Sequence, residues 1–299
     1  LMFFAKKNPD FLVIETGLGG RLDATNIINS DIALITNITF DHTAILGNSL
    51  KEIAYEKAGI IKNRELCIYA DSLPELEEEI NKKTENSINI IKKYNDMEIE
   101  LDKTNYKTLI KFQNNEFILP LFGKFQANNF LLAYETAKFY NIDNETIQNG
   151  VHKVYWPARF EFFSVEPPVI LDAAHNDDSI RKLIENLTEI YKRNEVIVIT
   201  SLLATKDFEK VFTKLEKITD KIFITSLKDT VNGLSSAEIR EKMISLNIPV
   251  DGIIFEDNIL TAYKSAMNII KEKNSGYKAI VICGSFFEIA KFNRIVADK

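Results

Sequence analysis

The second half of the chain alternates short apolar runs with longer amphipathic stretches. The runs are rich in valine and isoleucine and lie at residues 169–172, 195–200, 221–225, 252–255 and 278–283. Helical stretches of roughly 12–16 residues lie between them. Short apolar runs bounded by turn residues are typical of strands buried on both faces, and their alternation with helices favours a doubly wound parallel sheet. We therefore expect an α/β fold.

Polar residues follow three of these runs. Asp172-Ala-Ala-His-Asn176 comes after the first run, Leu203-Ala-Thr-Lys-Asp207 after the second, and Gly284-Ser285 after the last. Ligands bind at the carboxyl ends of strands in open parallel sheets, and a helix that begins after Ser285 could receive an anion at its N-terminus. Asp177 and Ser285 could instead only cap their helices. Three polar strand ends in one sheet favour a cleft.

The first half carries two candidate strand ends. The apolar runs Phe11–Ile14 and Ile32–Ile38 predict buried strands, and Glu15 and His42 follow them. A carboxylate that ends a buried strand before a glycine-rich loop resembles the position at which phosphate-handling enzymes hold Mg²⁺. If the two strands are neighbours, Glu15 and His42 face one crevice. Alternatively, Glu15 only caps a turn, and the glycines after it do not match G-x-G-x-x-G.

A lysine lies on the apolar face of the next predicted helix. Ser49 and Glu52 form the capping-box signature of this helix, and Gly59 ends it. Lys57 falls on the apolar stripe, whose other members are Leu50, Ile53 and Ala54. In the last turn Lys57 could complement the helix dipole and extend to water, or it could have a functional role. Spacing alone leaves both interpretations open.

Composition limits the classes of partner. With 299 residues the chain is long enough for two domains, and its net charge of −6 gives no support for nucleic-acid binding. Cys67 and Cys283 lie in separate apolar runs and indicate no disulfide framework, which favours a reducing compartment. No apolar run approaches the ~18 residues of a membrane span, and charged residues interrupt the start, where a signal peptide would lie. We expect a cytoplasmic monomer with no nucleic-acid or membrane partner.

The middle of the chain indicates the domain organisation. Residues 97–122 alternate apolar and polar around Asn114-Asn115, which predicts a hairpin, and residues 73–94 predict one amphipathic helix. Prolines mark an extended linker beyond them. The predicted parts are a first domain at 1–155, a linker at 156–167 and a Rossmann-like doubly wound C-terminal domain at 168–299.

Several motifs together resemble one family, the folylpolyglutamate synthase/dihydrofolate synthase group of the muramyl-ligase-like superfamily. In chain order they are Glu15-Thr-Gly-Leu-Gly-Gly-Arg-Leu-Asp-Ala-Thr-Asn26, Thr36-Asn-Ile-Thr-Phe-Asp-His42, Glu56-Lys-Ala-Gly-Ile60, Trp156-Pro-Ala-Arg-Phe160, Leu171-Asp-Ala-Ala-His-Asn176, Lys206-Asp207 and Gly284-Ser285. They occur in the family's order and span nearly the whole chain. Each motif alone is weak, but the combination is specific.

The resemblance implies ATP-dependent formation of an amide bond. A substrate carboxylate would take the γ-phosphoryl group of ATP and become an acyl phosphate, and the amino group of L-glutamate would then displace phosphate. The implied substrates are ATP, L-glutamate and dihydropteroate or folate. Mg²⁺ would neutralise the charge that develops on the phosphate oxygens. The sequence does not distinguish dihydropteroate from folates as the acceptor.

The resemblance also implies roles for individual residues. Glu15 and His42 match magnesium ligands, and Lys57 matches a lysine that is carbamylated beside a second metal, which would explain a lysine on an inward-facing stripe. His42 and Lys57 are therefore candidate catalytic residues, and His175 lies in a matching active-site loop. The residues that match ATP contacts are Asn129, Arg159 and Asp172. The residues that match a pterin-contacting loop are Leu22, Asp23 and Ala24.

Two departures from the family pattern stand out. No segment fits the P-loop G-x-x-x-x-G-K-[ST], which holds the ATP phosphates, and Ala158 stands where the family usually has glycine. The chain thus resembles the family without its N-terminal segment, with an incomplete P-loop-NTPase-like central domain, and we expect this chain alone not to turn over. The alternatives are a muramyl peptide ligase and a nucleotide-binding pseudoenzyme. The segment 41–47 and the Gly-Gly-Arg-Leu-Asp loop favour the folate type.

Overall fold

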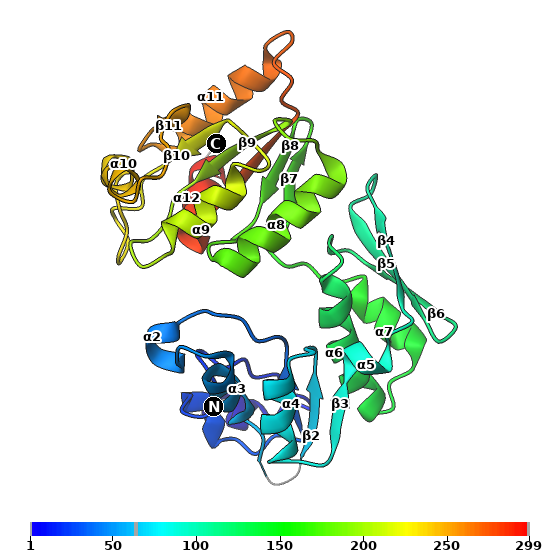
Figure 1. Ribbon diagram of the computed structural model, residues 1–299. Coiled ribbons are helices and arrows are strands. Elements are labelled where there is room, and N and C mark those ends of the chain that lie inside the picture. Colours follow the sequence, from blue (N-terminus) through cyan, green and yellow to red (C-terminus); the bar gives the residue numbers. More distant parts are fainter. Residues whose placement is uncertain (1, 63–64, 298–299) are drawn as a thin grey trace. The chain divides into compact units, whose positions relative to one another are not determined.

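The computed structural model describes residues 2–62 and 65–297, which form two compact units (Figure 1). Unit 1 comprises Leu1–Met97 and Asn128–Ile147, and unit 2 comprises Glu98–Ala127 and Gln148–Lys299. Among the described residues, no helix is both long and apolar enough to cross a membrane.

Unit 1 is built on a parallel three-stranded sheet of order β1-β2-β3. Its strands are β1 (Ile32–Ile35), β2 (Leu66–Tyr69) and β3 (Ser87–Asn89). Its helices are α1 (Met2–Lys7), the 3₁₀ helix η1 (Ala24–Ile27), α2 (Thr43–Leu46), α3 (Leu50–Ala58), α4 (Pro74–Asn81) and α5 (Ile90–Lys93). Two further helices, α6 (Gln126–Phe139) and α7 (Asn144–Val151), contain residues of both units.

The core of unit 1 joins the sheet to α3 and α4. Ile53 of α3 and Ile80 of α4 are fully buried and belong to one apolar cluster with Ile35 of β1. The predicted capping box of α3 is confirmed, because the Ser49 hydroxyl accepts a hydrogen bond from the Glu52 N–H and the Glu52 carboxylate accepts one from the Ser49 N–H. This cap fixes where α3 begins, and so fixes which face of the helix carries Lys57.

Two predictions for unit 1 are wrong. Phe11–Ile14 forms no strand and pairs with no neighbour among the described residues, and Val13 is 92% exposed. An extended apolar segment becomes a strand only when a neighbouring strand takes up its backbone hydrogen bonds. Residues 73–94 form α4, β3 and α5 rather than a single helix, because Ser87–Asn89 pairs with β2.

Unit 2 is built on a six-stranded sheet of order β11-β10-β9-β12-β8-β7. The strands are β7 (Glu161–Val165), β8 (Pro168–Leu171), β9 (Val196–Thr200), β10 (Ile222–Ile224), β11 (Ile253–Phe255) and β12 (Ala279–Cys283). All neighbouring pairs are parallel except β7 with β8. The predicted doubly wound sheet is confirmed, and β7 is an additional strand inside the stretch predicted as a linker.

Helices cover both faces of this sheet (Figure 1). They are α8 (Asp177–Ile190), α9 (Phe208–Leu215), α10 (Ser236–Ser245), α11 (Ile259–Lys271) and α12 (Phe286–Ala297). Val198 of β9 shares a buried cluster with Leu183 of α8, whereas the next residue, Ile199, shares another with Phe292 of α12. Because side chains alternate along a strand, the two clusters lie on opposite faces of the sheet. Burial on both faces explains the continuous apolar runs.

A smaller antiparallel sheet in unit 2 confirms the predicted hairpin. Its strands are β4 (Glu98–Asp102), β5 (Lys107–Phe112) and β6 (Asn115–Leu119). The β5–β6 turn is Gln113-Asn114, one residue earlier than predicted. Tyr106 stacks on Phe162 of β7 with 3.7 Å between ring centroids, so this small sheet is attached to the larger one. The predicted domain bounds stay a prediction.

Candidate active site

The carboxyl ends of β8 and β12 are joined directly in unit 2. The Asp172 N–H donates to the Ile282 carbonyl at 3.0 Å, and the Gly284 N–H donates to the Ala174 carbonyl at 2.8 Å. These bonds hold the segment after β8 against the turn between β12 and α12. Two of the three predicted polar strand ends therefore meet, at the edge where ligands bind in parallel sheets.

Asp172 organises the backbone around this edge. Its carboxylate accepts hydrogen bonds from the N–H groups of Phe160 and Ala174, both at 2.9 Å. Burial raises the pKa of Asp172 to about 6, against the opposing effect of these two hydrogen bonds and of the Arg159 guanidinium. Asp172 thus ties the Ala158–Phe160 loop to the end of β8.

The Ala158–Phe160 loop has a strained backbone. Ala158 has φ 58 and Phe160 has φ 50, in the left-handed region that side chains other than glycine rarely adopt. The Ala173 N–H donates to the Ala158 carbonyl at 2.9 Å, and the Glu161 carboxylate accepts from the Ala158 N–H at 2.8 Å. These bonds hold a conformation that glycine would adopt without strain, which is the physical reason to expect glycine at position 158.

Arg159 projects from this loop toward the start of α12. Its guanidinium carbon lies 4.8 Å from the centroid of the Phe286 ring. A guanidinium over an aromatic ring is held in place by the attraction between the cation and the ring. Phe286 directly follows Gly284-Ser285, so the structure brings the predicted residues Arg159 and Asp172 together at one strand edge.

His175 lies in the same segment, and its ring is oriented by the backbone. Its Nδ1 is 2.8 Å from the Ala173 carbonyl oxygen. A carbonyl can only accept, so Nδ1 carries the proton and Nε2 is the acceptor nitrogen of the neutral ring. Asn176 and Ser179 then begin α8 with a capping box. The orientation fits the predicted catalytic role of His175, which stays a prediction.

The turn at Gly284 requires glycine. Gly284 has φ 104, and a Cβ there would lie 2.3 Å from the Ser201 carbonyl oxygen. The Ser285 hydroxyl accepts a hydrogen bond from the Phe287 N–H at 3.1 Å, so Ser285 caps its own helix. Asp207 likewise accepts from the Lys210 N–H and caps α9. The capping interpretation is therefore confirmed for Ser285, whereas for Asp177 it is wrong, because Asn176 is the N-cap of α8.

In unit 1, Lys57 lies near Asp41, an acid outside the predicted set of metal ligands. The pKa of the partly buried Lys57 amine is lowered by burial, and the Asp41 carboxylate opposes this effect. Asp41 accepts from the His42 N–H at 2.9 Å and lies 3.8 Å from His42 Nε2. The structure therefore gathers His42 and Lys57 around Asp41. In the sequence, the only indication of this role for Asp41 was its position directly before His42 and after a predicted strand.

The positions of the predicted metal ligands support only part of the predicted metal site. Glu15 follows a segment that forms no strand, so the reason for placing it beside His42 at the edge of a sheet is lost. In residues 2–62 and 65–297, no group of three or more His, Cys, Asp and Glu side chains gathers as metal ligands. The set of Glu15, His42 and Lys57 stays a prediction.

Asp23 organises the glycine-rich loop of unit 1. Its carboxylate accepts from the N–H groups of Gly17 and Leu18 and from the N–H and hydroxyl of Thr25, and these bonds lower the pKa of Asp23 to about 2. Beside it, Leu22 is 77% exposed. Of the predicted pterin-contacting residues, Asp23 therefore shapes the loop and Leu22 is accessible.

The loop is also fixed to α3. Arg21 forms an ion pair with Glu56 at 2.8 Å, and the Arg21 N–H donates to the Glu56 carbonyl at 2.7 Å. A Cβ at Gly59 would lie 2.2 Å from the Arg21 Cβ, so the loop approaches α3 more closely than any other residue at 59 would allow. These contacts hold the glycine-rich loop against the last turn of α3, which carries Lys57.

The remaining predicted ATP contact, Asn129, does not lie at the strand edge of unit 2. Asn129 is exposed in the first turn of α6 and belongs to unit 1, whereas Arg159 and Asp172 belong to unit 2, so this set of three stays a prediction.

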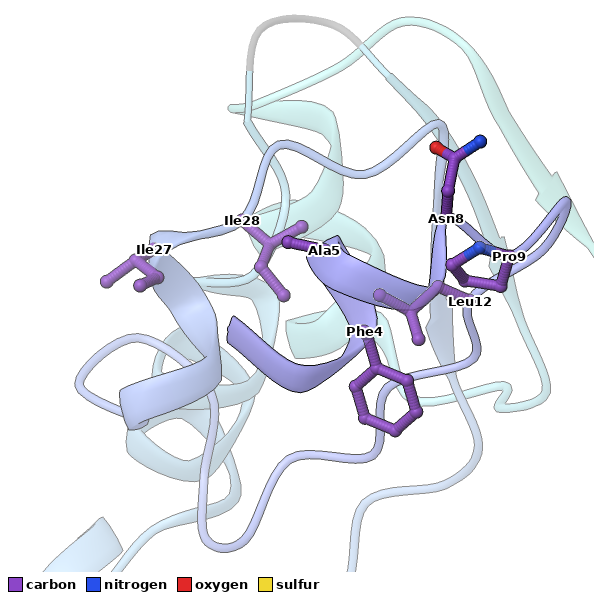
Figure 2. A pocket seen from close by; sticks show the side chains of 7 residues that line it. All are labelled: Phe4, Ala5, Asn8, Pro9, Leu12, Ile27 and Ile28. Atoms are coloured by element: carbon purple, nitrogen blue, oxygen red, sulfur yellow. The ribbon is translucent and has the colours of Figure 1, made fainter.

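A hollow of about 420 Å³ lies between α1 and η1 of unit 1 (Figure 2). Its lining residues are Phe4, Ala5, Asn8, Pro9, Leu12, Ile27 and Ile28. None of them is an acid, a base or a nucleophile, so the hollow is no site for chemistry.

Comparison with known proteins identifies related domains over most of the chain. Residues 1–137 match the Mur ligase middle domain, and residues 158–286 match the Mur ligase glutamate ligase domain. The chain is 25% identical to a solved Mycobacterium tuberculosis folylpolyglutamate synthase complexed with ADP and AMPPCP, with a TM-score of 0.83 over 98% of this chain and 70% of that chain. An Escherichia coli structure in complex with ADP, at 23% identity and a TM-score of 0.77, covers 95% of this chain and 66% of that chain and supports the same fold.

Two curated relatives share one name. The Bacillus subtilis dihydrofolate synthase/folylpolyglutamate synthase is 32% identical over an alignment of 240 positions, which covers 75% of this chain and 56% of that protein. The enzyme of that name from Buchnera aphidicola of Schizaphis graminum is 30% identical over an alignment of 307 positions, which covers 99% of this chain and 68% of that protein. This chain therefore spans about 56–68% of the length of these relatives. By this identity and coverage, the chain belongs to the dihydrofolate synthase/folylpolyglutamate synthase family of Mur-ligase-type proteins.

Proposed function

We propose that this protein is an ATP-dependent ligase that joins L-glutamate to dihydropteroate, to folates or to both. The observation that carries the proposal is the strand edge of unit 2, where Asp172 holds the Arg159 loop beside the turn at Gly284. It provides a fixed cation, an oriented imidazole and a helix N-terminus at one place. The relatives support it, since one solved member was complexed with ADP and AMPPCP and another with DHPP and ADP.

In the proposed reaction, the acceptor's carboxylate takes the γ-phosphoryl group of ATP and becomes an acyl phosphate. The amino group of L-glutamate attacks the acyl carbon, and the carbon–oxygen bond to phosphate breaks. This chemistry depends mainly on positioning and on stabilising negative charge. Arg159 supplies positive charge, and His175 Nε2 can accept the proton that the glutamate ammonium must lose before it attacks.

We further propose that Mg²⁺ is held by Glu15, by His42 and by a carbamate on Lys57. An amine adds carbon dioxide only when it is neutral, and burial lowers the pKa of Lys57 in this direction. A carbamate beside Asp41 would be a second negative charge at one place, which favours a divalent cation with oxygen ligands. When bound, Mg²⁺ would stabilise charge on the phosphate oxygens. Asn129, Arg159 and Asp172 are proposed to contact ATP, and Leu22, Asp23 and Ala24 the pterin.

We also propose that the protein is a cytoplasmic monomer whose partners are small molecules. Both cysteines, Cys67 and Cys283, are buried free thiols, in keeping with a reducing compartment. Size-exclusion chromatography with light scattering checks the oligomeric state, and a dimer at micromolar concentration would contradict this part.

The experiment is a glutamate-dependent ADP-release assay on the natural gene product that carries this sequence. The acceptors are dihydropteroate, tetrahydrofolate and a muramyl peptide, each with and without L-glutamate. We expect turnover with at least one pterin acceptor and none with the muramyl peptide. Turnover only with the muramyl peptide would favour the alternative ligase, and ADP binding without turnover on any acceptor would favour the pseudoenzyme.

A further inference from the structure

Arg159 is the cation at the strand edge of unit 2, and the acids beside it are engaged by other groups. The Asp172 carboxylate accepts from two backbone N–H groups, and the Glu161 carboxylate accepts from the Ala158 N–H and the Tyr155 hydroxyl. In the part of the chain that the structure describes, the Arg159 guanidinium forms no ion pair, and its one hydrogen bond runs from Nη1 to the Ala158 carbonyl at 3.3 Å. Most of its five N–H groups are therefore available to a ligand.

The contact that orients Arg159 is made by the ring of Phe286. The guanidinium carbon lies 4.8 Å from the ring centroid, within the range of a cation–π interaction. The hydrogen bond to the adjacent Ala158 carbonyl is long, and it restricts only one nitrogen of a flexible side chain. The ring of Phe286 therefore decides where the guanidinium lies.

Phe286 contributes little to the packing of α12. Ile289 and Phe292 are the residues of this helix that belong to the buried cluster on its face of the sheet. Phe286 is 48% exposed, and its neighbour Phe287 is 51% exposed. Because both rings are half exposed, either can be replaced without opening the core, and the contact with Arg159 can be tested separately from the fold.

The backbone fixes both partners of this contact. On one side, the bond from the Phe160 N–H to the Asp172 carboxylate holds the loop that carries Arg159. On the other side, the Gly284 N–H donates to the Ala174 carbonyl at 2.8 Å, which holds the turn that leads into α12. A cation and a ring that start from fixed backbone positions are arranged before a ligand arrives.

We propose that Phe286 is a positioning residue for the proposed ligase, whose ring holds the Arg159 guanidinium ready to pair with a phosphate group of the nucleotide. An arginine side chain loses rotamer freedom when it binds an anion, and a ring that already restricts the side chain removes part of that cost. The identity of the ligand rests on the proposed function, because a guanidinium pairs with phosphates of any source. The contact between ring and guanidinium does not rest on it and is tested without ligand.

The size of the effect follows from the exposure of the contact. A cation–π interaction at a partly exposed site corresponds to about a twofold to fivefold change in an equilibrium constant. Phe286→Leu removes the ring and keeps an apolar side chain, so it should weaken ADP binding by this factor. Phe286→Tyr keeps the ring and should bind ADP like the wild type. Phe287→Leu is the matched control, because Phe287 is the next residue and is exposed to the same degree.

The first measurement is the Nε–Hε NMR signal of Arg159 in the natural gene product that carries this sequence, without ligand. Arg159→Gln identifies the signal by its loss. A proton above an aromatic ring resonates upfield, so we expect Phe286→Leu to move the signal downfield, and Phe286→Tyr and Phe287→Leu to leave it near its wild-type position. An unmoved signal in Phe286→Leu would overturn the proposal, because the ring would not then hold the guanidinium.

The second measurement is calorimetry of ADP binding at constant Mg²⁺ concentration. We expect Phe286→Leu to weaken binding in the wild-type background and to have no further effect in Arg159→Gln, since the ring acts through the arginine. An equal loss in both backgrounds would overturn the proposal, because the ring would then contact the nucleotide itself or only support the fold. Unchanged affinity in Phe286→Leu would overturn it as well. Absence of ADP binding in the wild type would contradict the proposed function, while the Arg159 signal still decides whether Phe286 positions the guanidinium.

Discussion

Replacing Asp172 by alanine should destabilise unit 2 far more than the loss of one surface carboxylate would. The substitution leaves the N–H groups of Phe160 and Ala174 without their acceptor. An unpaired buried N–H costs about 1–3 kcal/mol, so the two together cost about 2–6 kcal/mol. The left-handed backbone at Phe160 then loses its bond to Asp172, and we expect the Arg159 loop to become mobile.

The assay is urea unfolding followed by the fluorescence of Trp156, the single tryptophan, which lies two residues before the strained loop. Asp207→Ala is the matched control, because Asp207 is also an aspartate at a strand end but accepts only one backbone bond in capping α9. Loss of an N-cap typically costs about 1 kcal/mol. If Asp172→Ala unfolds at the same urea concentration as Asp207→Ala, the inference that Asp172 ties the loop to β8 is refuted.

The pH dependence of the unfolding free energy provides a second test of the role of Asp172. Its pKa in the folded protein, about 6, lies above the ordinary 3.8. The stability from its neutral form is therefore fully present below about pH 3.8 and is lost as pH rises through 6. Asp172→Asn cannot titrate, so the difference in unfolding free energy between wild type and this variant should narrow over that interval. A difference that widens would show that the raised pKa has been assigned with the wrong sign.

Four further predictions follow from the geometry. Gly284→Ala should lower stability by about 1–3 kcal/mol and weaken ligand binding, because the added Cβ meets the Ser201 carbonyl oxygen; calorimetric melting measures the first effect. Asp23→Asn should loosen the glycine-rich loop at neutral pH, and in the wild type the order that Asp23 provides is present above about pH 3.8 and is lost as pH falls through about 2, which hydrogen exchange at Gly17 and Leu18 can follow. Lys57→Arg should abolish the proposed ligation in the natural gene product that carries this sequence, since arginine cannot be carbamylated, and intact-protein mass spectrometry in bicarbonate should show an added 44 Da on the wild type only, the mass of carbon dioxide. Limited proteolysis should leave residues 98–127 associated with the C-terminal fragment, and Tyr106→Ala should release them, because the stack on Phe162 is lost.

The central strands of the unit 2 sheet, β8, β9, β10 and β12, were predictable because they are buried on both faces. They are short, mainly apolar runs, and the amphipathic stretches between the runs are long enough to be the covering helices. The half-exposed strand β7 was not predicted. In unit 1 the same reasoning gave a strand at Phe11–Ile14 that the structure lacks. Hydrophobicity marks a segment that avoids water, whereas a strand also needs a neighbour to pair with, and that neighbour is not visible in the local sequence. Conversely, Ser87–Asn89 has one apolar residue and becomes β3 only because β2 pairs with it.

The candidate site was predictable as a set of residues but not as an arrangement. The motifs pointed to Asp172, yet its partners are backbone N–H groups, which have no sequence signature. The left-handed conformation of Ala158 was indicated only by the family resemblance, in which glycine usually stands at this position, because alanine itself gives no sign of it. Asp41 gained a role only when its charge was found to act on Lys57.

The most direct test of the proposed reaction is transfer of ¹⁸O from the acceptor to phosphate. The acceptor, dihydropteroate or tetrahydrofolate, is labelled in its carboxylate and incubated with ATP, Mg²⁺, L-glutamate and the natural gene product that carries this sequence. If an acyl phosphate forms, one ¹⁸O atom appears in each phosphate released, since the carbon–oxygen bond breaks when glutamate attacks. Phosphate released without ¹⁸O, while the glutamate product accumulates, would contradict the account.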